Sequence, residues 1–172
     1  MLYMLMFAAC NSINTTEAEL VFDSLFQPIS DIRDLVLEEE ERNADISVSL
    51  SQGSNWEGTI EAQGQRQDYP LQVEYTVEIS FADVYVTTGD LYINGTVESF
   101  IVYTLEETDS QSYSVDTTLS GNLNVTGDVG GTAKLDYTLS KEYDYASDTI
   151  RVEAQGKISG TDVSEFTKGS TE

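Results

Sequence analysis

Polar and apolar residues alternate along most of this chain. The alternation is clearest over residues 46–50, 56–64, 71–81, 91–105, 113–125, 133–139 and 150–158. Because successive side chains of a β-strand point to opposite faces, each stretch predicts a strand with one apolar face. The remaining positions are mostly Thr, Ser, Asn, Gln, Asp and Glu, which is typical of an antiparallel sheet with one face in water. The pattern therefore predicts a meander of about seven antiparallel strands.

Glycine occupies several positions where the alternation requires an apolar side chain. These positions are Gly58, Gly64, Gly95, Gly121, Gly156 and Gly160. Glycine inside a strand lets a sheet bend sharply or lets another backbone approach closely, so we expect a strongly curved sheet with another element in its concave side. Asn94-Gly95 is also a two-residue hairpin signal. The unbroken alternation over residues 91–105 favours one continuous strand with a kink over a hairpin at this point.

One segment, residues 18–41, has the periodicity of an amphipathic helix. Its apolar positions include Val21, Leu25, Ile29, Ile32 and Val36. Thr15 or Thr16 is expected to cap its N-terminus. Pro28 removes one helical hydrogen bond and predicts a kink, or two short helices joined near Gln27. The apolar face of this segment needs a partner, and we predict that it packs in the concave face of the sheet, which gives an α+β, mainly β fold.

The first ten residues are apolar and end in Phe7-Ala8-Ala9-Cys10. This ending resembles the lipobox that closes the signal peptide of bacterial lipoproteins, although Phe7 stands where that pattern prefers Leu. The resemblance covers about ten residues and implies that Ala8 and Ala9 precede a cleavage point and that Cys10 is lipidated. It divides the chain into a signal peptide remnant (1–9), a tether (10–16), a single helix-plus-meander domain (17–160) and a flexible tail (161–172).

The same resemblance implies a place in the cell. A lipoprotein of this type is exported and held at the bacterial cell envelope, on the outer membrane or periplasmic face, by the lipid on Cys10. The chain has one cysteine, so no disulfide can form within it and the folded domain depends on its core. The lipid would then be its only membrane attachment.

The net charge narrows the range of partners. The chain has 8 Lys and Arg against 31 Asp and Glu, a formal charge of −23. Such a surface repels phosphate backbones, so we expect no nucleic-acid binding. The charge is typical of proteins adapted to concentrated salt, and an acidic surface that weakly collects divalent cations is the competing interpretation. No specific metal or cofactor site is predicted.

The chain contains no histidine. Catalysis by a Ser-His-Asp triad, and by most zinc sites, therefore lacks its usual residue. With no recognisable catalytic motif, we expect a protein that is not an enzyme. A carboxylate-based glycan hydrolase stays open as an alternative, since paired acids can perform that reaction, but the sequence singles out no pair. Glu74, Glu78 and Glu98 are expected to line the solvated face of the sheet.

Four of the ten tyrosines, Tyr75, Tyr103, Tyr113 and Tyr137, fall on the apolar positions of predicted strands. They are either core residues, which we favour, or the lining of a pocket between sheet and helix. These features predict a lipid-anchored binding or structural module of the cell envelope, with an apolar ligand or an envelope protein as its partner. A carrier of apolar ligands in a cavity between helix and sheet is the other non-enzymatic alternative.

Overall fold

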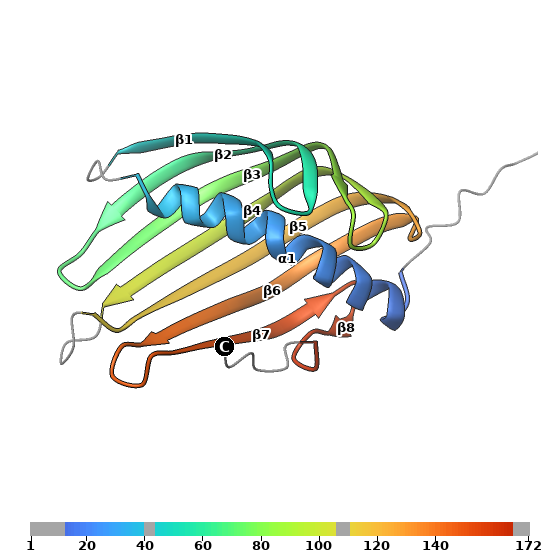
Figure 1. Cartoon of the computed structure of the whole chain (residues 1–172). Helices are drawn as coiled ribbons and strands as arrows, with labels where there is room; N and C mark the ends of the chain where they lie inside the picture. The colour runs from blue at the N-terminus through green and yellow to red at the C-terminus, as the bar shows by residue number, and fades with distance from the viewer. Residues whose placement is uncertain (1–12, 40–43, 106–110, 167–172) are drawn as a thin grey trace, which may run out of the picture.

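The computed structural model describes residues 13–39, 44–105 and 111–166. Its single sheet has eight strands, each antiparallel to the next, in the order β1-β2-β3-β4-β5-β6-β7-β8. One helix, α1, lies across the concave face of this curved sheet (Figure 1). The α+β, mainly β fold with a helix in the concave face is therefore confirmed. Cys10 lies outside the described residues.

The elements follow one another with short connections. Their bounds are α1 Thr15–Leu37, β1 Asp45–Gln52, β2 Trp56–Asp68, β3 Gln72–Val86, β4 Leu91–Leu105, β5 Tyr113–Gly127, β6 Gly131–Asp144, β7 Thr149–Ile158 and β8 Thr161–Asp162. The first seven strands lie where the alternation predicts them. The sheet has one strand more than the predicted seven. This strand, β8, pairs with the end of β7 and is too short to show any alternation.

The helix cap lies one or two residues before the cap predicted at Thr15 or Thr16. Asn14 is the N-cap: its side-chain oxygen accepts a hydrogen bond from the Glu17 backbone N–H at 3.1 Å, and the Glu17 carboxylate accepts from the Asn14 N–H at 2.6 Å. This reciprocal capping box satisfies two N–H groups that a helix start leaves without partners. Ile13, expected in the tether, is buried in the core, so the folded domain starts before residue 17.

The helix also differs from expectation at Pro28 and at its end. It runs as one helix through Pro28, so the alternative of two short helices joined near Gln27 is wrong. Proline removes a single hydrogen bond, and the buried residues Leu25 and Ile29 on either side hold the segment against the sheet. The helix ends at Leu37 instead of residue 41, with Glu38 as its C-cap, because acidic residues there oppose the helix dipole.

Strand β4 is continuous through Asn94 and Gly95, as predicted. Gly95 pairs with Phe81 on β3 and with Leu123 on β5, so no hairpin interrupts the ladder there. Its φ of +129° is a conformation that other residues rarely adopt. Glycine is therefore needed at this position to bend the strand without breaking it.

The expected flexible tail is partly folded. Beyond β8, Val163 is fully buried and the ring of Phe166 lies 5.7 Å from that of Phe22 on α1. The domain therefore extends past Gly160 to Phe166, and residues 167–172 lie outside the described part. The sequence missed this closing segment because two apolar residues in a polar stretch show no periodicity.

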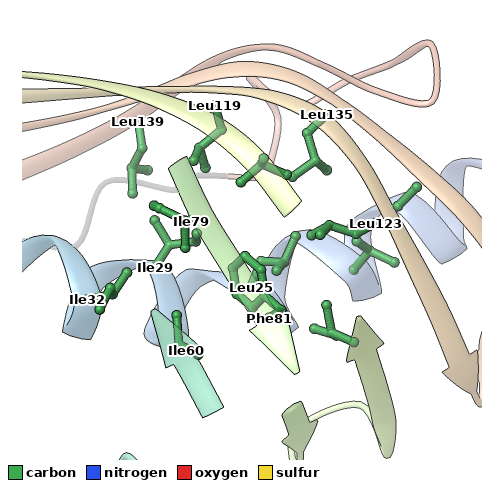
Figure 2. Close-up of a cluster of buried hydrophobic side chains, with 14 of the residues drawn as sticks. Leu25, Ile29, Ile32, Ile60, Ile79, Phe81, Leu119, Leu123, Leu135 and Leu139 are labelled. Atoms are coloured by element: carbon green, nitrogen blue, oxygen red, sulfur yellow. The ribbon is translucent and has the colours of Figure 1, made fainter. Parts of the chain in front are cut away.

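The core lies between α1 and the sheet. In Figure 2, Leu25, Ile29 and Ile32 point from the helix toward the sheet residues Leu119, Leu135 and Leu139. The exposed fraction of these six side chains is 2% or less. Burying side chains of this size contributes about 1.5–3 kcal/mol each, so this packing is the main force that holds the helix in place.

Candidate ligand-binding surface

The helix crosses the sheet obliquely, and two contacts define its course. Near its N-terminus, the ring of Phe22 lies 5.7 Å from that of Tyr137 on β6. Farther along, Asp31 accepts a hydrogen bond from the indole N–H of Trp56 at the start of β2, at 2.7 Å. The helix thus passes from β6 to β2 and leaves one corner of the concave face uncovered, at the lower left of Figure 1.

The contact between Trp56 and Asp31 sets the angle of the helix. Trp56 is buried, and Asp31 is held in place by a second hydrogen bond, from the Gln27 side-chain amide at 2.6 Å. Both oxygens of this carboxylate are thereby used within the fold. Asp31 therefore connects α1 to β2, and Gln27 holds Asp31 in place. In the sequence alone, both residues are simply polar positions of the helix.

We predict that Trp56→Phe lowers the free energy of unfolding by about 1–3 kcal/mol, because the variant leaves a partly buried carboxylate oxygen without its donor. Urea unfolding of Trp56→Phe, Asp31→Ala and the double variant measures the effect as a double-mutant cycle. A coupling energy indistinguishable from zero would contradict the role of this hydrogen bond.

Of the four tyrosines predicted on the apolar face, two belong to the core. Tyr137 is buried against Phe22, and burial raises the pKa of its phenol well above the ordinary value of a tyrosine. Tyr75 is also buried, with the Arg66 guanidinium 5.7 Å from the centre of its ring. Burial raises the pKa of Tyr75 as well, although the nearby Arg66 opposes that shift. These two residues fit the core interpretation.

Because the Tyr137 phenol is neutral in the folded protein, alkaline pH should reduce stability. Above the pKa of about 10 of an exposed tyrosine, the unfolded chain loses this proton while the folded chain keeps it. The free energy of unfolding should therefore decrease by about 1.4 kcal/mol for each pH unit above about 10. Tyr137→Phe should show a shallower decline between pH 9 and 11 in urea unfolding. Equal slopes in the two proteins would contradict this prediction.

The other two predicted tyrosines lie in the uncovered corner. Tyr103 on β4 and Tyr113 on β5 are half-buried, with ring centres 5.4 Å apart and ring planes only 28° apart. Tyr143 on β6 continues the row, 5.4 Å from Tyr113. Burial raises the pKa of Tyr103. The structure thus brings Tyr103 and Tyr113 together with a third tyrosine, which lies beyond the alternation predicted over residues 133–139.

Strand register shows what surrounds this row. Eight half-buried side chains on β3 to β7 share the concave face here, and we call them the tyrosine end: Val73, Tyr103, Leu105, Tyr113, Lys141, Tyr143, Ile150 and Val152. These side chains form two neighbouring lines of paired residues that run across the strands. One line contains Leu105, Tyr113, Tyr143 and Ile150, and the other four residues belong to the second line. The alternation could have identified Tyr143, because it lies an even number of positions after Tyr137 and both side chains therefore lie on the same face of β6.

A groove of about 420 Å³ borders the tyrosine end on its β3 side. It is lined by Arg66, Asp68, Tyr69, Pro70, Leu71, Gln72, Val73, Tyr103 and Leu105. Tyr69 and Leu71 are among the most exposed large apolar residues of the described chain. The volume lies within the range of about 300–1,000 Å³ found for small-molecule sites.

Charges at this end of the sheet are mostly satisfied within the fold. Arg66 forms an ion pair with Asp68 at 2.8 Å and also donates to the backbone carbonyl of Glu39, after the helix. On α1, Arg33 is buried and pairs with Asp34 at 2.7 Å. Lys141, in contrast, makes no ion pair with any carboxylate in residues 13–39, 44–105 and 111–166.

The predicted acidic face lies on the opposite, convex side. Glu78 on β3 and Glu98 on β4 are exposed and stand directly opposite each other in the ladder, as the alternation predicts. A shallow hollow of about 390 Å³ lies beside them, next to the exposed ring of Phe100. A glycan hydrolase uses a pair of carboxylates, and that alternative stays a prediction.

Comparison of the chain with protein-family models, with curated proteins and with solved structures gives no match. No helix in the described part of the chain has a stretch long and apolar enough to cross a membrane. Within that same part, no three potential metal-ligating side chains come together in one group.

Proposed function

We propose that this protein is a non-enzymatic binding module of the bacterial cell envelope, anchored by lipid on Cys10, and that the tyrosine end is its ligand-binding surface. The observation that carries the proposal is the oblique course of α1. The helix covers most of the apolar face of the sheet and leaves stacked, half-buried tyrosines beside an open groove.

The packing beneath the helix favours this surface over a cavity between helix and sheet. The side chains that face one another there, including Leu25, Ile29 and Leu119, are almost fully excluded from solvent. A carrier of apolar ligands would therefore bind its ligand at the tyrosine end. Tyrosine suits this role, because its ring contributes a large contact area and its hydroxyl can remain hydrated.

Native mass spectrometry of the protein, extracted in mild detergent from a bacterial host, tests the binding surface. We expect an additional small-molecule mass on the native chain. It should be lost in Tyr113→Asp, which places a charge at the tyrosine end. The matched control is Asn122→Asp on the convex face of the same strand, where the side chain is exposed and the same charge is added. Retention of the mass in Tyr113→Asp would contradict the proposed surface.

The anchor is tested separately, by expression with a complete signal peptide and measurement of intact mass. A mature chain that starts at an acylated Cys10 is expected, and Cys10→Ser should remain unacylated. An unmodified native chain that keeps Met1 would contradict the anchor. That result would leave the binding surface unaffected, because the tyrosine end lies within the folded domain.

A further inference from the structure

The charged side chains of this protein are divided unequally between the two faces of its sheet. On the ladder positions of the concave side, the charged residues of the described strands are Arg66, Asp68 and Lys141. The convex side carries most of the strand acids, including Glu61, Glu78, Glu98, Asp116, Asp136 and Glu142. In a chain with a net charge of −23, the concave ladder positions thus carry two cations and one acid.

Lys141 is the charged residue of this face that has no ion-pair partner in the described part of the chain. Arg66 and Asp68, in contrast, form an ion pair with each other. Its neighbours across the ladder are Val115 on β5 and Val152 on β7, so its half-buried stem lies among apolar side chains. An ammonium group among apolar side chains can bind a ligand that has one anionic group attached to an apolar body.

We propose that the ligand of the tyrosine end is a fatty carboxylate, with its carboxylate at Lys141 and its chain beside Tyr113 and across Tyr103. This inference rests on the proposed function and names the ligand class of that same site. Strands β3 and β6, which carry Val73 and Lys141, are three spacings apart, about 14 Å. A chain of that length that starts at Lys141 would cross Val115 and Tyr103, beside Tyr113, and reach the groove at Val73.

The arrangement of the rings argues against a cationic ligand. Quaternary ammonium groups bind over the open faces of aromatic rings. Tyr103 and Tyr113 instead turn those faces toward each other, with centres 5.4 Å apart, and Tyr143 lies at the same distance on the other side of Tyr113. The row therefore offers ring edges, an apolar contact that suits an alkyl chain. A polyanion is disfavoured, because the acidic surface repels it.

The experiment is a titration with laurate below its micelle concentration, followed by NMR of the tyrosine-labelled chain carrying Cys10→Ser. We expect the signals of Tyr103, Tyr113 and Tyr143 to shift. Lys141→Gln should weaken binding about fivefold, the effect of a partly solvated ion pair. Lys141→Arg should retain most of the affinity. Lys134→Gln, on the convex face of the same strand, is the matched control and should leave the affinity unchanged.

Decyl maltoside, an uncharged amphiphile, separates this inference from the proposed function. If decyl maltoside shifts the three tyrosines as strongly as laurate does, and Lys141→Gln has no effect on laurate, the carboxylate inference is overturned and the binding surface stands. If neither compound shifts these signals, the tyrosine end does not bind amphiphiles and both proposals fail. High salt should weaken laurate binding alone, because it screens the ion pair.

Discussion

Leu25→Ala is expected to lower the free energy of unfolding by about 3–5 kcal/mol, a large part of the 5–15 kcal/mol typical of a folded domain. Leu25 lies in the middle of α1, is fully excluded from solvent and points into the sheet (Figure 2). Truncation removes apolar contact and leaves a cavity that the curved sheet cannot close without moving its strands. Urea unfolding followed by circular dichroism measures the change.

Glu19→Ala on the same helix is the control, because the side chain is exposed and Ala favours helices. Its effect should stay within about 0.5 kcal/mol. If Leu25→Ala were equally mild, the helix would contribute little to stability, and the sheet would have to be stable without it.

Gly64→Ala is expected to cost about 3 kcal/mol, for a different reason. A β-carbon at Gly64 would lie 2.0 Å from the backbone carbonyl oxygen of Thr76 on β3. Backbone atoms in the centre of a sheet cannot move aside as a flexible side chain can, so β2 and β3 would have to separate. Thermal unfolding should show a decrease in Tm of well over 4 °C.

Gly130→Ala is the matched control for this substitution. A β-carbon at Gly130 meets no atom within 4 Å, and the residue is exposed in the turn before β6. The same chemical change should therefore have almost no effect there. A neutral Gly64→Ala would mean that the strands tolerate separation at this point, and the close approach would then not be what requires glycine.

The alternation of residues predicted the face of each strand correctly. Tyr75, Tyr103, Tyr113 and Tyr137 all lie on the concave side, as their positions indicate. The alternation cannot distinguish a position beneath the helix from one beyond its edge, since both are apolar. For this reason the sequence identified Tyr103 and Tyr113 only as members of a larger set, and it missed Tyr143 and Lys141, which complete the tyrosine end.

The order of residues along the chain is enough to predict the local features of this protein: seven of the eight strands, the amphipathic helix and the continuity of β4. Each of these follows from the geometry of successive residues, which is the same wherever the segment lies. The oblique course of α1, in contrast, follows from tertiary packing. It depends on the contacts of Trp56 with Asp31 and of Phe22 with Tyr137, which join residues far apart in the chain. The candidate site is the part of the concave face that this course leaves uncovered, so its position is a property of the packing and not of any single segment.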